Sequence, residues 1–114
     1  MSSLATKPAD ALEHTRRIGR ALADQGRLRI LAALAGSELC VCHLVDLLDL
    51  DASTVSRHVS ILRDAGLVET RKDGRWLHCR RATDQNPLFK FLDTSLRGAQ
   101  EIEDDKKRLS DDCC

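Results

Sequence analysis

The stretch DASTVSRHVSILRDAGLV, residues 51–68, is the most informative part of the sequence about the fold. Asp51 is a favoured N-cap residue and Gly66 is favoured just past a helix end, so the stretch predicts a helix over residues 52–65. Val55, Val59 and Leu62 recur at helical spacing and should face the core. The other faces carry small hydroxyl and arginine side chains, namely Ser53, Thr54, Ser56, Arg57, Ser60 and Arg63. Such a surface is typical of a helix that lies in the major groove of DNA, and the alternative is that it only keeps the helix soluble.

The segment that follows this helix predicts a β-hairpin. Two alternating stretches, residues 67–72 and 75–81, flank the dipeptide Asp73-Gly74, which is a strong signal for a two-residue turn. Basic residues outnumber acidic ones between positions 53 and 81, although the net charge of the chain is 0. A locally basic segment in a neutral protein fits a surface that faces phosphate, whereas a plain solvated face is the alternative.

Three helices are expected on the N-terminal side of residue 51. Residues 1–8 are predicted to be a flexible arm, and helical spacing begins after it. Asp24 suits the N-cap of a second helix that Gly36 ends. A third helix is expected over residues 42–50, immediately before the helix at residues 52–65.

The C-terminal part predicts one long helix, from Leu88 to about Arg108, which begins after Asn86-Pro87. Its apolar stripe is long for so small a domain. We therefore expect this helix and the first one to pack across the two-fold axis of a homodimer. Residues 9–108 would then form one domain, and residues 109–114 an acidic tail that ends in cysteines.

Length and composition limit the class of protein. At 114 residues the chain is long enough for one modest core, and 42% hydrophobic with 32% charged residues is an ordinary globular composition. Only 3% of the residues are aromatic, which favours helices over an all-β fold. The longest apolar run, residues 30–35, is far shorter than the roughly 20 residues that cross a bilayer, and the N-terminus lacks an export signal. We expect a cytoplasmic protein without a membrane partner.

Five cysteines in such a chain predict free thiols, metal ligands or redox groups rather than structural disulfides. Cys42 is expected at the N-cap of the third helix, where the positive helix end lowers the pKa of a thiol. Cys40 lies two residues earlier in an extended segment, so the two sulfurs can converge. Paired thiolates select soft, thiophilic ions. The alternative is that both cysteines are small buried hydrophobic residues.

Four stretches in this order resemble the ArsR/SmtB family of bacterial metal-responsive repressors. They are LADQGRLRIL (residues 22–31), ELCVCHL (38–44), the stretch at 51–68, and RKDGRWLHCR (71–80). The resemblance implies a mainly α, homodimeric winged helix-turn-helix with a small β-hairpin. It also implies a repressor, not an enzyme, that binds double-stranded operator DNA.

The resemblance assigns roles to residues in two elements. Positions of the family's recognition helix are matched by Ser53, Thr54, Ser56, Arg57 and His58. For His58 the alternative is that it caps or packs against the wing. At the hairpin turn, Arg71, Lys72 and Arg75 match positions that contact phosphate, which adds affinity but little sequence information.

The resemblance also implies an inducer. The arsenic-responsive members bind As(III) through a pair of cysteines that matches Cys40 and Cys42, and we expect arsenite, or antimonite as Sb(III), to release the operator. In those members a third cysteine follows three residues after the second, and here that position is Val45. A cadmium- or lead-responsive repressor and a thiol-based redox sensor remain as alternatives. The expected mechanism is that the ion draws Cys42 out of its capping position and shifts the third helix.

A third sulfur must come from elsewhere in the chain. Cys113 and Cys114 end a tail that looks able to fold back, although a silent chain end is the alternative. Cys79 is interpreted as core filler in the second strand of the hairpin. His43 offers a nitrogen, but we expect it to point away from its neighbour Cys42. A redox enzyme is disfavoured because the Cys-x-x-Cys spacing is lacking.

Overall fold

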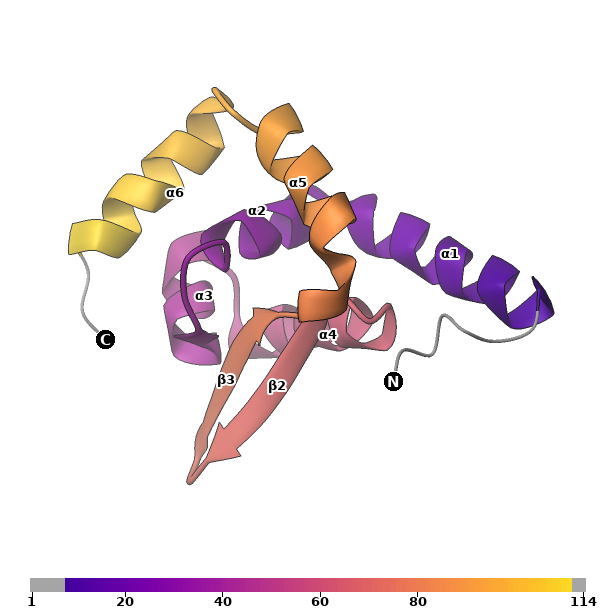
Figure 1. Cartoon of the computed structure of the whole chain (residues 1–114). Coiled ribbons are helices and arrows are strands. Elements are labelled where there is room, and N and C mark those ends of the chain that lie inside the picture. Colours follow the sequence, from indigo (N-terminus) through magenta and orange to yellow (C-terminus); the bar gives the residue numbers. More distant parts are fainter. Residues whose placement is uncertain (1–7, 112–114) are drawn as a thin grey trace.

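The computed structural model describes residues 8–111, and it is mainly helical with a small antiparallel sheet (Figure 1). The elements are α1 Pro8–Leu22, α2 Gln25–Ala33, β1 Leu39–Cys40, α3 Val41–Leu48, α4 Ala52–Asp64, β2 Val68–Asp73, β3 Trp76–Arg81, the 3-10 helix η1 Thr83–Gln85, α5 Asn86–Ser95 and α6 Gln100–Asp111. The predicted fold class is confirmed. The predicted division into arm, domain and tail stays a prediction, and most of the arm lies outside the described residues.

The two predicted N-caps are confirmed. The carboxylate of Asp24 accepts a hydrogen bond from the backbone N–H of Arg27 at 3.1 Å, and that of Asp51 accepts from Thr54 N–H at 2.8 Å. Each bond satisfies a backbone donor that the first helical turn leaves without a partner. Hydrogen bonds from Thr54 also hold the pKa of Asp51 below its usual range. These caps fix where α2 and α4 begin.

The hairpin after α4 is confirmed, but its turn lies one residue later than predicted. Asp73 pairs with Trp76, so Gly74 and Arg75 form the turn instead of Asp73 and Gly74. Gly74 has φ of +61°, and glycine is the residue that adopts such a φ without strain at the first position of a two-residue turn. The prediction of an Asp-Gly turn was wrong because Asp73 completes the strand.

A third strand joins the hairpin at its edge. The sheet order is β1-β3-β2, and Leu39 and Cys40 of β1 pair with Cys79 and His78 of β3. The segment before α3 was expected to be extended, and it is extended because it pairs with β3. The cysteine-bearing segment is therefore tied by backbone pairing to the hairpin.

The core is built from aliphatic side chains, as the scarcity of aromatic residues predicts. Ile30, Leu31, Leu44, Leu62 and Leu67 are fully buried. Val55, Val59 and Leu62 of α4 face this core, which confirms the predicted inner face. The face of α4 that carries Ser53, Ser56 and Arg57 is exposed.

The single long C-terminal helix that was predicted is wrong. The structure has two helices, because α5 ends at Ser95 and Gly98 adopts φ of +87°, which a regular right-handed helix does not allow. Figure 1 shows α6 turning away from α5 and running back toward α3. Arg29 of α2 and the buried Asp105 of α6 join at 2.8 Å and fasten α6 to the core.

No helix within residues 8–111 is both long and apolar enough to span a membrane.

Candidate DNA-binding surface and thiol site

The outer face of α4 is polar and carries the residues that the sequence singled out. Ser53, Ser56, Arg57 and Arg63 are exposed, and Thr54 and Ser60 are half-buried. Within residues 8–111, Arg57 forms no ion pair. Its guanidinium is therefore available to a partner outside the chain. The whole face is held outward because the opposite face of α4 is buried in the core.

His58 points elsewhere. Its Nδ1 lies 3.0 Å from the guanidinium Nη1 of Arg27, and its Nε2 lies 3.7 Å from the carboxylate of Asp24. The imidazole is only 14% exposed. His58 was predicted to contact DNA, but the structure places it between α4 and the start of α2, because its position on the helix faces that neighbour. It packs against α2, and not against the wing as the alternative had it.

The three basic residues of the hairpin differ in their surroundings. Lys72 and Arg75 are exposed and form no ion pair within residues 8–111. Arg71 is bound by the carboxylate of Glu38 at 2.7 Å, and this bond holds the pKa of Glu38 below its usual range. Glu38 lies immediately before β1, so this ion pair is a second link between the hairpin and the cysteine segment.

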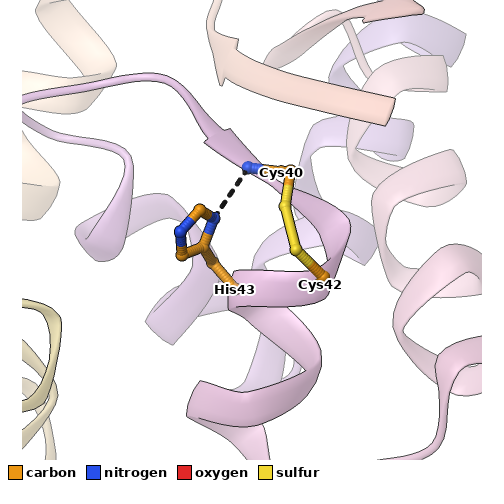
Figure 2. Close-up of a disulfide and its surroundings, with 3 residues drawn as sticks. All are labelled: Cys40, Cys42 and His43. Atoms are coloured by element: carbon orange, nitrogen blue, oxygen red, sulfur yellow. Dashed lines mark hydrogen bonds between the residues drawn. A yellow bond between two sulfur atoms is a disulfide. The ribbon is translucent and has the colours of Figure 1, made fainter. Parts of the chain in front are cut away.

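The cysteine pair lies where β1 runs into α3, as Figure 2 shows. The N-cap of α3 is Cys40, and Cys42 lies inside the first turn, so the prediction that Cys42 caps the helix was wrong. The N-cap lies two residues earlier than expected because the pairing of Cys40 with His78 ends the extended segment there. The predicted mechanism required Cys42 to leave a capping position, and it does not apply because Cys42 does not cap the helix.

The sulfurs of Cys40 and Cys42 do converge, and the structure joins them in a disulfide. This differs from the expectation of free thiols. The convergence itself is what the extended segment before the helix predicted. Cys40 is buried, whereas Cys42 is half-buried, so reagents reach the pair from the Cys42 side.

His43 belongs to the same cluster. Its Nδ1 accepts a hydrogen bond from the backbone N–H of Cys40 at 3.2 Å, and its ring lies beside the two sulfurs (Figure 2). Ligand atoms of Cys40, Cys42 and His43 all lie within 4.8 Å of one another. The expectation that His43 points away was wrong. The signal that could have found it is the pairing of an N-cap residue with the residue three positions later, as in a capping box.

The other cysteines are separate from this cluster. Cys79 is fully buried in the core, and burial raises the pKa of its thiol to about 11, which suits the core-filler interpretation. Cys113 and Cys114, the predicted source of further sulfur, lie outside the described residues. Near the end of α6, Arg108 donates to the carbonyls of Asp46 and Leu47 in α3.

Comparison with known proteins agrees with this arrangement. Residues 24–70, which run from the cap of α2 into β2, match the family described as "Bacterial regulatory protein, arsR family". The arsenical resistance operon repressor of Escherichia coli K12 is 45% identical over 83 residues, which cover 70% of each chain. The arsenic resistance transcriptional regulator ArsR1 of Pseudomonas putida is 33% identical over 94 residues, 82% of this chain and 70% of that one.

A solved structure shares the fold. The homodimeric winged helix-turn-helix DNA-binding domain of Mycobacterium bovis superposes with a TM-score of 0.71 at 30% identity, covering 88% of this chain and 94% of that chain. In this comparison α3 and α4 are the helix-turn-helix and the β2–β3 hairpin is the wing. Sequence, fold and placement of the polar helix agree, and this chain belongs to the ArsR family of bacterial transcriptional regulators.

Proposed function

We propose that this chain is a homodimeric repressor that binds operator DNA and releases it when Cys40 and Cys42 capture As(III) or Sb(III). One observation carries the proposal. The two sulfurs lie together at the start of α3, the helix that packs against α4, so a thiophilic ion would bind one helix away from the DNA-facing surface. The names of the relatives in Escherichia coli and Pseudomonas putida support arsenic as the inducer.

The DNA contacts follow from exposure and charge. We assign base and backbone contacts to the outward residues of α4, with Arg57 at the centre because it is exposed and forms no ion pair within the described residues. Lys72 and Arg75 at the tip of the wing would bind phosphate, which strengthens binding to all duplexes alike. Arg71 would join them only after leaving Glu38.

The homodimer would form through α1 and α5. Leu12 of α1 is 76% exposed and Phe91 of α5 is 63% exposed, and large apolar side chains at such exposure suit an interface between subunits. The Mycobacterium bovis relative is described as homodimeric. Two copies would then present two α4 helices to two half-sites of the operator.

Coupling between ion and DNA would pass through the start of α3. Cys40 is at once the N-cap of α3 and a strand residue paired with β3, so any movement of its sulfur pulls on both the helix and the wing. The coupling is reciprocal, and a value of about 1 to 3 kcal/mol, typical of allostery, would weaken operator binding by about 5- to 150-fold.

The remaining ligands of an inorganic ion are proposed from two places. His43 stands within the cluster and offers a ring nitrogen. Cys113 and Cys114 follow α6, whose last turns contact α3, and an extended chain of three residues spans about 10 Å. Either source would add the further ligand that an ion bound by Cys40 and Cys42 needs.

A second candidate function is a redox sensor, and the disulfide between Cys40 and Cys42 favours it. In that case an oxidant such as hydrogen peroxide would take two electrons from the two thiols. The S–S bond would form, and the peroxide and the two thiol protons would become two water molecules. Release of DNA would then need no ion. The two functions use the same pair of sulfurs and differ in what reacts with them.

One experiment tests the proposal against its rival. The chain is reduced with a phosphine, which unlike a thiol reductant does not compete for arsenic through sulfur, and is bound to a labelled duplex selected from a random pool. Arsenite, antimonite, cadmium, lead and hydrogen peroxide are then titrated separately while fluorescence anisotropy follows DNA release. We expect release at the lowest concentration with arsenite or antimonite. Release by peroxide alone would favour the redox sensor and contradict the proposal.

A further inference from the structure

The end of α3 is held by side chains from two other helices. The last backbone carbonyls of a helix have no partner within it, and a glycine just past the helix end often accompanies the bonds that satisfy them. In this chain the residue after α3 is Asp49, with φ of +55°, and its N–H donates to the carbonyl of Val45 at 3.0 Å. The carbonyls of Asp46 and Leu47 are bound by arginines that are distant in the sequence.

Arg108 of α6 forms two of these bonds. Its Nη2 donates to the carbonyl oxygen of Asp46 at 2.7 Å, and its Nη1 donates to that of Leu47 at 2.9 Å. The Nη2 of Arg29 in α2 donates to the same Leu47 oxygen at 3.2 Å. Both guanidinium groups are positive and lie at the negative end of the α3 dipole, where a cation stabilises a helix. The C-terminal cap of α3 therefore comes from α6 and α2.

The helix that carries Arg108 is itself anchored on α2. Arg29 donates to both carboxylate oxygens of Asp105, at 2.8 and 2.9 Å, so one arginine contacts α6 and α3 together. Asp105 and Ile102 of α6 are only 4% and 5% exposed. Figure 1 shows α6 running from the end of α5 toward α3. This helix is thus a fixed support against which the end of α3 is held.

The position of α3 matters to α4 because the connection between them is short. Only residues 49–51 separate the two helices. Asp51 ends this connection and caps α4 through the backbone N–H of Thr54, so a displacement of the end of α3 is passed to the start of α4. Arg57, the proposed centre of the DNA contacts, lies in the second turn of α4.

We propose that α6 is a clamp that holds α3 and α4 in the orientation that binds DNA, with Arg108 as its positioning residue. The inference rests on the proposed function, because the orientation of α4 matters only if α4 contacts the operator. Residues 96–99 join α6 to α5, the helix proposed for the dimer interface. The clamp therefore also fixes each α4 relative to the two-fold axis, and this sets the distance between the half-sites that a dimer can bind.

The competing role for Arg108 is a direct contact with DNA, since its side chain is exposed. Salt dependence separates the two roles. Each phosphate contact that is lost lowers the slope of log affinity against log salt concentration by about 0.9. A residue that positions α4 without binding phosphate leaves this slope unchanged when it is replaced.

The test measures how the full chain and its variants bind the selected duplex and a scrambled one, by fluorescence anisotropy at several salt concentrations. We expect Arg108→Ala to bind the selected duplex about three- to tenfold more weakly, the loss expected when one or two hydrogen bonds are removed. Its affinity for the scrambled duplex and its salt slope should stay unchanged. Arg108→Lys keeps the charge and can donate to one of the two carbonyls, so its loss should be smaller. Lys106→Ala is the matched control, because the ion-pair partner of Lys106 is Glu103 of the same helix, and it should bind as the unchanged chain does.

Amide hydrogen exchange gives a readout that does not involve DNA. The hydrogen-bonded amides at the end of α3, including that of Asp49, should exchange faster in Arg108→Ala than in Lys106→Ala. The amides of β2 and β3 should stay equally protected in both variants. Circular dichroism establishes that each variant is folded at the temperature of the measurement. If Arg108→Ala does not fold, Arg108→Gln takes its place, and the same outcomes decide.

The outcomes separate the inference from the function on which it rests. Operator affinity of Arg108→Ala equal to that of the unchanged chain would overturn the inference, and so would an equal loss in Lys106→Ala. A salt slope lowered by about 0.9 in Arg108→Ala would show a phosphate contact in place of the clamp. If the unchanged chain binds the selected and scrambled duplexes alike, the proposed function itself fails, and the inference fails with it.

Discussion

At the scale of single residues, Arg57 near the middle of α4 is exposed, and its guanidinium has no ion pair within the described residues. We predict that Arg57→Ala lowers operator affinity by about 1 to 3 kcal/mol, toward the affinity for unrelated DNA, because a bidentate base contact is worth that much. Gel shifts with the selected duplex and a scrambled one measure the loss. Lys90→Ala on α5 is the control and should bind as the unchanged chain does. If Arg57→Ala and the unchanged chain bind the operator with equal affinity, Arg57 of α4 does not contact the operator bases.

Cys79 is a residue whose chemistry burial suppresses. Its pKa is raised to about 11 by desolvation, so the folded chain favours the neutral thiol while the unfolded chain ionises near pH 9. The contribution of this thiol to the free energy of unfolding is fully present below pH 9 and is lost as the pH rises toward 11. We predict that the free energy of unfolding falls over this range by about 1 to 2 kcal/mol more in the unchanged chain than in Cys79→Ala. Urea denaturation at pH 8, 9, 10 and 11 checks this, and parallel curves would show that Cys79 ionises normally.

At the scale of elements, a partly buried ion pair helps to fasten α6 to the core. Arg29 is 26% exposed and Asp105 is 6% exposed, and the guanidinium binds both carboxylate oxygens. Asp105→Ala leaves the arginine charge without its partner, and we predict a loss of about 2 to 3 kcal/mol in the free energy of unfolding. Asp104→Ala removes a carboxylate from the same helix whose hydrogen bond within residues 8–111 is to Gln100, and it should cost little. A loss of the same size in both variants would show that α6 is not fastened by Arg29.

The sequence predicted where a helix begins when the interaction that fixes its start joins residues close together in the chain. Asp24 and Asp51 cap their helices through bonds to residues three positions away, so a short stretch of sequence contains the whole interaction. The start of α3 could not be found this way, because the pairing of Cys40 with His78 in a distant strand decides it. The two C-terminal helices were missed because their apolar spacing continues across Gly98, and only its backbone conformation shows the break.

In the candidate site, too, the sequence predicts features that depend on neighbouring residues and misses those that depend on distant ones. The cysteine pair and the outer face of α4 follow from spacing alone, since each lies within one or two helical turns. The surroundings of His58 could not be predicted, because Arg27 and Asp24, which lie beside it, come from another part of the chain. The contact of α6 with the end of α3 could not be predicted at all, because Arg108 meets Leu47 only after the chain has folded.

At the scale of the whole molecule, function requires two copies in our account. Phe91 is 63% exposed on α5, and we predict that Phe91→Asp shifts the chain from dimer to monomer by placing a charge in an apolar interface. Trp76→Asp adds the same charge to an exposed apolar residue on the wing and should leave the dimer intact. Sedimentation equilibrium gives the two masses. A dimeric Phe91→Asp variant would mean that α5 does not form the interface.

The central claim is that the pair of sulfurs at the start of α3 controls whether DNA stays bound. The most direct measurement is arsenite-driven release of the labelled operator from the reduced chain and from Cys40→Ser and Cys42→Ser, followed by fluorescence anisotropy. We predict that all three proteins bind the operator with similar affinity. Serine keeps the size of cysteine at both positions, and at position 40 it is also a favoured N-cap residue. Only the unchanged chain should then release its DNA as arsenite is added. Release from both serine variants at the same arsenite concentration as from the unchanged chain would contradict the account.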